Sequence, residues 1–198
     1  GRILDAGLTC FAERGYFGTR VPDIAREAGV GAGTLYRYFD SKEFLVNEVY
    51  RREKRRLMTW LLEGFDFEGE PRRVFHRFWQ RLAGYARTHP QSFAFLELHH
   101  HGEYLDAESR ALEEQALLPS AAVLEGARRD GRVRDLAAPT LMALVWGALV
   151  GLVKGARLGY LELTDEVVAD AEAACWALVQ RRDDEEDEEP ESMSLEEL

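Results

Sequence analysis

The spacing of small and apolar residues between positions 19 and 39 limits the possible fold more than any other feature of this sequence. Ala25 is small enough to lie where two helices touch, and Gly29, four residues later, suits a left-handed backbone position. Val30 and Leu35 then fall where the second of two helices would face inward. The pattern predicts two short helices that cross steeply and leave one side of the second helix open to solvent.

Helical periodicity continues through most of the chain, and no stretch predicts a β-strand. We expect Gly15 to end a first helix, and Thr19 to cap a second helix that has Pro22 in its first turn. Asp40 and Glu43 are spaced as a capping box for a fourth helix. The helices that we predict from the third onward cover residues 32–39, 41–63, 72–88, 91–101, 105–130, 137–160 and 165–181.

The predicted fold class is therefore all-α, with an N-terminal three-helix helix-turn-helix domain over residues 1–45 and a larger helical bundle over residues 46–181.

Charge is uneven along the chain, whose formal net charge is −11. Residues 1–62 hold 11 basic and 8 acidic side chains, so this N-terminal part of the chain has the net positive charge that binding to phosphate requires. Residues 181–198 hold two arginines and ten acidic side chains, which predicts that residues 182–198 form a solvated, disordered tail.

The second helix of the pair carries side chains suited to the major groove of DNA. Ala32 and Gly33 are small, so the backbone can lie close to base edges, while Thr34 offers a hydroxyl and a methyl group. Side chains that can reach phosphate or guanine follow: Tyr36, Arg37 and Tyr38. The alternative is a helix with purely aromatic core residues. However, successive helical residues differ by about 100°, so three aromatic rings in four residues cannot all face inward.

This part of the chain resembles the TetR family of bacterial repressors over residues 3–45, ILDAGLTCFAERGYFGTRVPDIAREAGVGAGTLYRYFDSKEFL. The resemblance lies in Phe-x-x-x-Gly-Tyr-x-x-Thr, Ile-Ala-x-x-Ala-Gly-Val and Gly-Thr-Leu-Tyr-x-Tyr-Phe-x-x-Lys. It implies phosphate contacts from Thr19, Tyr36, Tyr38 and Lys42 and base contacts from Ala32, Gly33, Thr34 and Arg37, and Arg20 completes the predicted DNA-binding set. Pro22 stands where many members carry a polar residue, so we expect base recognition to depend on residues 32–37 and on DNA shape.

The resemblance also implies that the remaining helices form an effector-binding and dimerisation body, whose last two helices make a four-helix bundle with a twofold mate. Small residues four apart between positions 143 and 159 would let another helix approach closely, although packing within one subunit is the alternative. The expected dimer interface comprises Ala143, Gly147, Gly151, Gly155, Ala171, Cys175 and Leu178. A homodimer would read successive major grooves of a palindromic operator in double-stranded DNA.

Aromatic residues on the middle helices suggest a pocket for an apolar or aromatic small-molecule effector, although core packing explains most of them. The expected pocket residues are Phe75, Trp79, Phe93, Leu96, His100, Tyr104, Trp146 and Val150. We therefore expect a dimeric transcriptional repressor that an effector releases from its operator. A DNA-bound scaffold that recruits a protein partner, without a small-molecule effector, is the alternative.

The sequence predicts no cofactor, no metal site and no catalytic residues, so we do not expect an enzyme. Cys10 and Cys175 match no metal-binding spacing and are expected to be buried thiols in a reducing cytoplasm. The consecutive histidines 99–101 would point in different directions on a helix and could not bind one metal ion. Residues 136–153 carry no charge, but Pro139 and the glycines there favour a buried core or interface over a membrane span.

Overall fold

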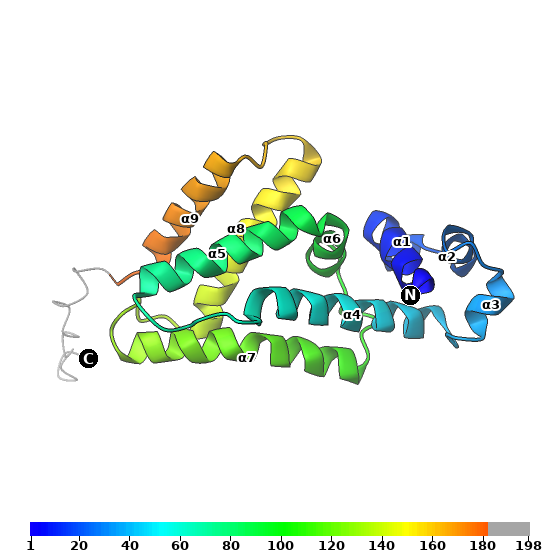
Figure 1. The fold of residues 1–198 in the computed structure, drawn as a ribbon, viewed down its shortest axis with the longest axis horizontal. Helices are drawn as coiled ribbons and strands as arrows, with labels where there is room; N and C mark the ends of the chain where they lie inside the picture. The colour runs from blue at the N-terminus through cyan, green and yellow to red at the C-terminus, as the bar shows by residue number, and fades with distance from the viewer. Residues whose placement is uncertain (182–198) are drawn as a thin grey trace, which may run out of the picture.

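The computed structural model describes residues 1–181, in which the regular elements are helices and no β-strand occurs (Figure 1). The predicted all-α fold is confirmed for these residues, and the predicted acidic tail, 182–198, lies outside them. The N-terminal helices are α1 (Arg2–Gly18), α2 (Val21–Glu27) and α3 (Ala32–Tyr36). The later helices are α4 (Lys42–Leu62), α5 (Pro71–Thr88), α6 (Pro90–Leu98), α7 (Ala107–Arg129), α8 (Ala138–Leu158) and α9 (Asp165–Val179).

The molecule is elongated, with α1, α2 and α3 at one end and α8 and α9 toward the other (Figure 1). The long helix α4 runs from α3 into the body, where it lies beside α7, and α8 packs between α7 and α9. One continuous hydrophobic core joins the two ends, because Phe11 on α1 belongs to the same buried cluster as Trp79 and Leu149. The helix-turn-helix is therefore packed against the body.

The start of α2 differs from the prediction, because Thr19 is not its cap. The helical backbone of α1 breaks at Gly15, where φ is +67°, and the chain folds back so that Thr19 becomes fully buried. The Thr19 hydroxyl lies 2.7 Å from the carbonyl oxygen of Gly15 and 3.0 Å from that of Cys10, and donates to these oxygens. Arg20 occupies the N-cap position without a capping side-chain hydrogen bond.

The capping box predicted for α4 is also wrong. Ser41, not Asp40, is the N-cap residue, and its Oγ accepts a hydrogen bond from the backbone N–H of Phe44 at 3.0 Å. The extended backbone of Ser41 (φ −150°, ψ 166°) places its short side chain over the free N–H groups of the first turn. The start of the helix itself is displaced by only one residue from the prediction.

Two helices end three residues earlier than predicted: α3 ends at Tyr36 instead of 39, and α6 ends at Leu98 instead of 101. After α6, His99 has an extended backbone, and its Nε2 donates to the carbonyl oxygen of Ala12 on α1 at 3.0 Å. These observations place the histidines in a connector that holds the body against α1, and not on a helix.

A buried carboxylate fastens α5 to α9. Glu172 on α9 accepts hydrogen bonds from Arg72 at 2.5 Å and Gln80 at 3.1 Å, and His76 Nδ1 lies 2.9 Å from both of its oxygens. Burial alone would raise the pKa of Glu172, but the hydrogen bonds from His76, Arg72 and Gln80 lower it below its ordinary value. The carboxylate is therefore ionised and paired, as a buried charge must be.

Candidate functional site

The turn between α2 and α3 has the geometry that the sequence predicts. Gly29 has a φ of +65°, which lies in the left-handed region, and the N–H of Val30 donates to the carbonyl oxygen of Ala25 at 2.9 Å. Ala25 and Leu35 are buried where the helices meet. With that side of α3 buried, its other side faces solvent.

We call the exposed part of α3 and the two residues after it the recognition surface: Ala32, Gly33, Thr34, Tyr36, Arg37 and Tyr38. All six residues are exposed, and Tyr36 and Tyr38 are 52% and 66% accessible to solvent. Phe39, by contrast, is half-buried and packs against Phe44 with ring centroids 6.1 Å apart. The aromatic residues after Thr34 thus divide between solvent and core.

Arg20 lies at the N-terminus of α2 and is exposed. Its Nε donates to the Asp23 carboxylate at 3.2 Å, and Arg26 donates to the other oxygen of that carboxylate at 2.9 Å. The hydrogen bond from Arg20 is the main cause that lowers the pKa of Asp23, with a further contribution from Arg26. Asp23 therefore holds two cations in place around the first turn of α2.

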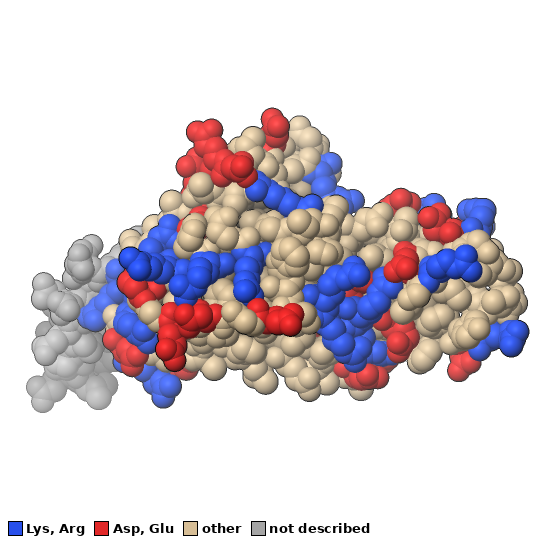
Figure 2. All heavy atoms as spheres, in the orientation of Figure 1, with Lys and Arg blue, Asp and Glu red and all other residues tan. Residues whose placement is uncertain are grey.

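Positive charge is less concentrated at this end of the molecule than the sequence suggests. Five of the eleven basic residues in positions 1–62 lie on α4, between positions 51 and 56. Figure 2 shows basic side chains gathered over α4 and α5 on the viewed face, while both signs are scattered over the end formed by α1, α2 and α3. Attraction for phosphate at that end therefore depends on individual side chains.

Lys42 and Thr19, two of the predicted phosphate contacts, make contacts inside the protein. The Lys42 ammonium donates to the carbonyl oxygens of Tyr16 at 2.9 Å and Thr19 at 3.1 Å, and it lies 4.0 Å from the centroid of the Tyr16 ring. Thr19 is fully buried, so its side chain cannot reach a phosphate in this conformation. Lys42 has three N–H donors, of which one remains for a phosphate.

The body contains a cavity of about 370 Å³ bounded mainly by α4, α7 and α8, which we call the main cavity. Its lining is mostly apolar and comprises Lys54, Leu57, Met58, Leu61, Leu62, Phe78, Glu97, Glu113, Ala116, Leu117, Ser120, Ala121, Pro139, Met142, Ala143, Val145 and Trp146. Small-molecule sites have this composition, with a few polar groups among apolar side chains.

Three charged side chains lie in the wall of the main cavity, and we call them the polar cluster: Lys54, Glu97 and Glu113. The Lys54 ammonium lies 2.6 Å from Glu113 Oε2 and 3.8 Å from Glu97 Oε1. The indole N–H of Trp146 donates to Glu97 Oε2 at 2.6 Å, and the Tyr50 hydroxyl donates to Glu113. Burial raises the pKa of Glu97, which the Lys54 charge and the Trp146 hydrogen bond partly offset.

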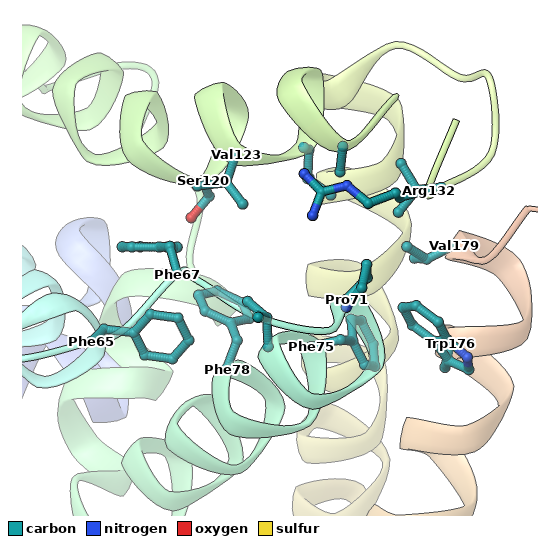
Figure 3. A pocket seen from close by; sticks show the side chains of 15 residues that line it. Phe65, Phe67, Pro71, Phe75, Phe78, Ser120, Val123, Arg132, Trp176 and Val179 are labelled. Carbon is teal, nitrogen blue, oxygen red and sulfur yellow. The ribbon is translucent and has the colours of Figure 1, made fainter. Parts of the chain in front are cut away.

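A second cavity, of about 120 Å³, lies next to the main cavity between α5, α7 and α9 (Figure 3). Aromatic rings form much of its wall: Phe65, Phe67, Phe75, Phe78 and Trp176. Arg132 lies across the cavity from these rings in Figure 3. Phe78 and Ser120 line both cavities, so these two side chains lie between the two spaces.

Most of the predicted pocket residues do not line either cavity. Trp146 lines the main cavity and Phe75 the second one. The buried members are core residues, as the indole of Trp79 illustrates by donating to the carbonyl oxygen of Val168 at 3.0 Å. The six residues that line neither cavity are Trp79, Phe93, Leu96, His100, Tyr104 and Val150, of which His100 is exposed to solvent.

Sequence reasoning missed the polar cluster, although one signal for it was present. Along α4, Tyr50, Lys54, Leu57 and Leu61 recur at helical spacing and face the body together. A lysine in such a buried stripe needs a carboxylate partner. Nothing in the sequence says that this partner comes from α7.

A line of contacting rings joins the polar cluster to the helix-turn-helix. Tyr50 packs edge-on against His101, with ring centroids 5.1 Å apart. Burial lowers the pKa of His101 to about 4, and its Nε2 donates to a backbone carbonyl, so its Nδ1 accepts a hydrogen bond from the Tyr104 hydroxyl at 2.7 Å. Tyr104 in turn stacks on Tyr16 at 4.3 Å, beneath the Lys42 ammonium.

Helices α8 and α9 leave an apolar face uncovered by the rest of the subunit. α8 is the one helix among residues 1–181 that is apolar and long enough to pass as a membrane span, yet only 28% of its apolar window is buried. A Cβ atom added at Gly147 or Gly151 would meet nothing within 4 Å. Leu144 and Leu178 are also exposed, so this face is open and apolar.

The predicted interface residues divide between this face and the interior. Ala143, Gly147, Gly151 and Leu178 are exposed, whereas Ala171 is half-buried. Gly155 and Cys175 are buried within the subunit, and a Cβ atom at Gly155 would lie 2.6 Å from Leu161. A row of residues four apart drifts around the helix by about 40° per step, which explains why the far end of the row turns inward.

Comparison with known proteins agrees with this architecture. The family model for bacterial regulatory proteins of the tetR family matches residues 3–49, and the model for the tetracyclin repressor-like C-terminal domain matches residues 50–181. The HTH-type transcriptional repressor KstR2 from Rhodococcus jostii is 53% identical over 49 residues, which cover 25% of this chain and 24% of that repressor. The match thus spans about a quarter of this relative's length.

Solved structures share the fold over nearly the whole length. A TetR family transcription regulator from Marinobacter aquaeolei has a TM-score of 0.80 at 24% identity, covering 91% of this chain and 95% of that one. The regulator FadR from Bacillus subtilis, solved in complex with stearoyl-CoA, has a TM-score of 0.68 at 18% identity, covering 89% and 96% of the two chains. Because the family models match residues 3–181 from end to end, the chain belongs to the TetR family and is a DNA-binding transcription regulator.

Proposed function

We propose that the protein is a dimeric repressor and that an effector bound in the main cavity releases it from its operator. The observation that carries the proposal is the course of α4. This single helix begins at Lys42, against the helix-turn-helix, and ends beside the main cavity, whose wall contains Lys54, Leu57 and Leu61. A ligand that displaces α4 at one end must therefore act on the DNA-binding end.

DNA would be bound by the recognition surface together with Arg20. The exposed phenols of Tyr36 and Tyr38 are placed to donate to phosphates, and Arg37 to contact phosphate or guanine. Small residues at positions 32 and 33 let α3 approach the base edges closely. We retain Lys42 as a phosphate contact through its remaining N–H, with a second role in holding the α1–α2 connection.

Dimerisation would use the uncovered face of α8 and α9. A second copy is the natural occupant of this face because glycines on α8 permit close helix contact and a twofold pair would bury both faces at once. Two copies would then present their recognition surfaces about 34–36 Å apart, as successive major grooves require. The protein would act in the bacterial cytoplasm, where its DNA lies.

The cavity favours a ligand-responsive regulator over a scaffold that recruits a partner protein, because a scaffold has no need of an open interior. FadR, which shares the fold, was solved with a bound acyl-CoA, in line with a ligand-binding body. The coupling must be reciprocal: the operator should weaken effector binding by the same factor by which the effector weakens operator binding.

The test begins with selection of an operator from a random DNA library and measurement of binding by fluorescence anisotropy at several salt concentrations. We expect Arg37→Ala to weaken binding and to reduce the slope of log K against log salt by about 0.9 for each phosphate that the variant no longer neutralises. We expect the double change Tyr36→Phe and Tyr38→Phe to weaken binding while leaving that slope nearly unchanged. Tyr160→Phe, at an equally exposed tyrosine between α8 and α9, is the matched control. Unchanged operator affinity in the recognition-surface variants would contradict the site.

A further inference from the structure

We propose that the main cavity selects an apolar ligand that carries a cationic amine, and that the amine binds at Glu97. The inference rests on the proposed function in one respect, which is that the occupant of the cavity is the effector. It goes further by naming the charge of that effector, which follows from the polar cluster.

The charges in the cavity wall do not balance. Two carboxylates, Glu97 and Glu113, face one ammonium, that of Lys54, and the other wall residues within the described range 1–181 are uncharged. The Lys54 side chain is only 7% exposed and that of Glu97 13%, so water screens these two charges poorly, whereas Glu113 is 39% exposed and better screened. A ligand that brings one positive charge would balance the cluster and would offset the burial that raises the pKa of Glu97.

The hydrogen bonds identify Glu97 as the carboxylate that is open to a ligand. Glu113 accepts from the Tyr50 hydroxyl and is paired with Lys54 at 2.6 Å. Glu97 Oε2 accepts from the Trp146 indole, but its Oε1 has Lys54 only at 3.8 Å, beyond hydrogen-bonding distance. A ligand ammonium could donate to Glu97 Oε1 without displacing a hydrogen bond already present.

The same contacts disfavour an anionic ligand such as a fatty carboxylate or a phosphate. Among the residues that the structure describes, the only cation in the wall is Lys54, and Glu113 already occupies it. An anion that accepted from a remaining N–H group of Lys54 would lie close to both carboxylates, which would repel it. The charges in the wall of the main cavity therefore do not suit an anionic acyl ligand.

The apolar part of the ligand would lie along the leucines of α4 and point toward the second cavity. Phe78 and Ser120 line both cavities, and Figure 3 shows Phe78 among the rings of the aromatic wall and Ser120 across from them on α7. A ligand with an amine at one end and an aromatic ring at the other would thus meet a carboxylate at Glu97 and rings at the second cavity.

The test uses three ligands that share one apolar part and differ in their polar end: phenylbutylamine, phenylbutanol and phenylbutanoate. Calorimetric titration of the full chain should show that the amine binds at least about tenfold more tightly than the carboxylate, a difference of about 1.4 kcal/mol. Glu97→Gln should remove this preference. Glu114→Gln, at the exposed neighbour of Glu113 on α7, should keep it.

Comparable binding of amine and carboxylate to the unaltered protein, or no binding of the amine, would overturn the proposal without any variant being needed. A preference for the amine that survives in a folded Glu97→Gln protein would also overturn it. Operator release is measured separately, by anisotropy. If phenylbutanoate binds as tightly as the amine and releases the operator, the charge inference fails while the repressor mechanism stands. If the amine binds as predicted but leaves operator affinity unchanged, the binding preference stands and the mechanism fails.

Discussion

Alanine at Gly147 and Gly151 should have opposite effects on the isolated subunit and on the dimer, and this difference tests the proposed interface. Both glycines lie inside α8, where glycine is less favourable than alanine by about 1 kcal/mol each. An added Cβ atom would meet nothing within 4 Å at either position. The double change should therefore stabilise the isolated subunit by about 2 kcal/mol.

In the dimer the same methyl groups would enter a close helix contact, and the twofold axis would place each of them there twice. Inserting methyl groups into a packed contact costs about 1–3 kcal/mol. Dimer dissociation should thus become tenfold easier for about every 1.4 kcal/mol of this cost. A more stable subunit together with a weaker dimer would indicate that Gly147 and Gly151 lie in a close helix contact between two copies.

Urea unfolding at low protein concentration measures the stability of the subunit, and sedimentation equilibrium measures the dissociation constant of the dimer. Gly126→Ala on α7 is the control, because that helical glycine also has nothing within 4 Å of a Cβ atom and lies outside the proposed face. It should stabilise the subunit and leave dimerisation unaltered. If the double variant at positions 147 and 151 behaves like Gly126→Ala in both assays, the glycines do not lie at the dimer contact.

Three further changes test other parts of the structure. Tyr104→Phe removes the donor to His101 Nδ1 but keeps the stacked ring, so it should lower the free energy of unfolding in urea titrations by about 1–3 kcal/mol. It should also reduce the effect of ligand on operator affinity. An undiminished effect would rule out the line of contacting rings as the route of coupling. The pKa of Glu172 is lowered in the folded chain, so its stabilisation is present above its ordinary value of 4.5 and is lost as the pH falls through the lower folded value. Glu172→Gln should therefore flatten the loss of thermal stability below pH 4.5, and an unaltered profile would exclude this carboxylate as a cause. Leu35→Ala should lower the free energy of unfolding by about 2–5 kcal/mol because Leu35 is fully buried between α2 and α3. Circular dichroism combined with anisotropy should show that operator binding is lost before the body unfolds. Intact operator binding would contradict the packing role of Leu35.

The sequence predicted the turn between α2 and α3 well because its determinants are local. The left-handed backbone at Gly29 and the buried side chains of Ala25 and Leu35 follow from residues within one short stretch. The burial of Thr19 was not predicted: the break at Gly15 turns its side chain into the interior, where it meets carbonyl oxygens nine and four residues away. A periodic pattern does not show such a turn.

The main cavity could not be predicted in the same way, because its wall combines residues from helices that are distant in the sequence. Lys54, Glu97 and Glu113 come from three different parts of the chain and each looks like an ordinary surface charge in its own segment. The aromatic residues that the sequence favoured, such as Trp79 and Phe93, fill the core instead. Large rings are the best fillers of a core, so they mark cavities poorly.

The contacts of the Lys42 ammonium with the carbonyl oxygens of Tyr16 and Thr19 make α4 the arm of a lever. Its 21 residues span about 31 Å at about 1.5 Å per residue. A tilt of about 5° around the cavity end would therefore move the other end by about 3 Å, and the ammonium would carry the α1–α2 connection with it. In a dimer the twofold axis relates the two α4 helices, so both would tilt in the same way. A small displacement at each cavity would therefore change the distance between the two recognition surfaces twice over.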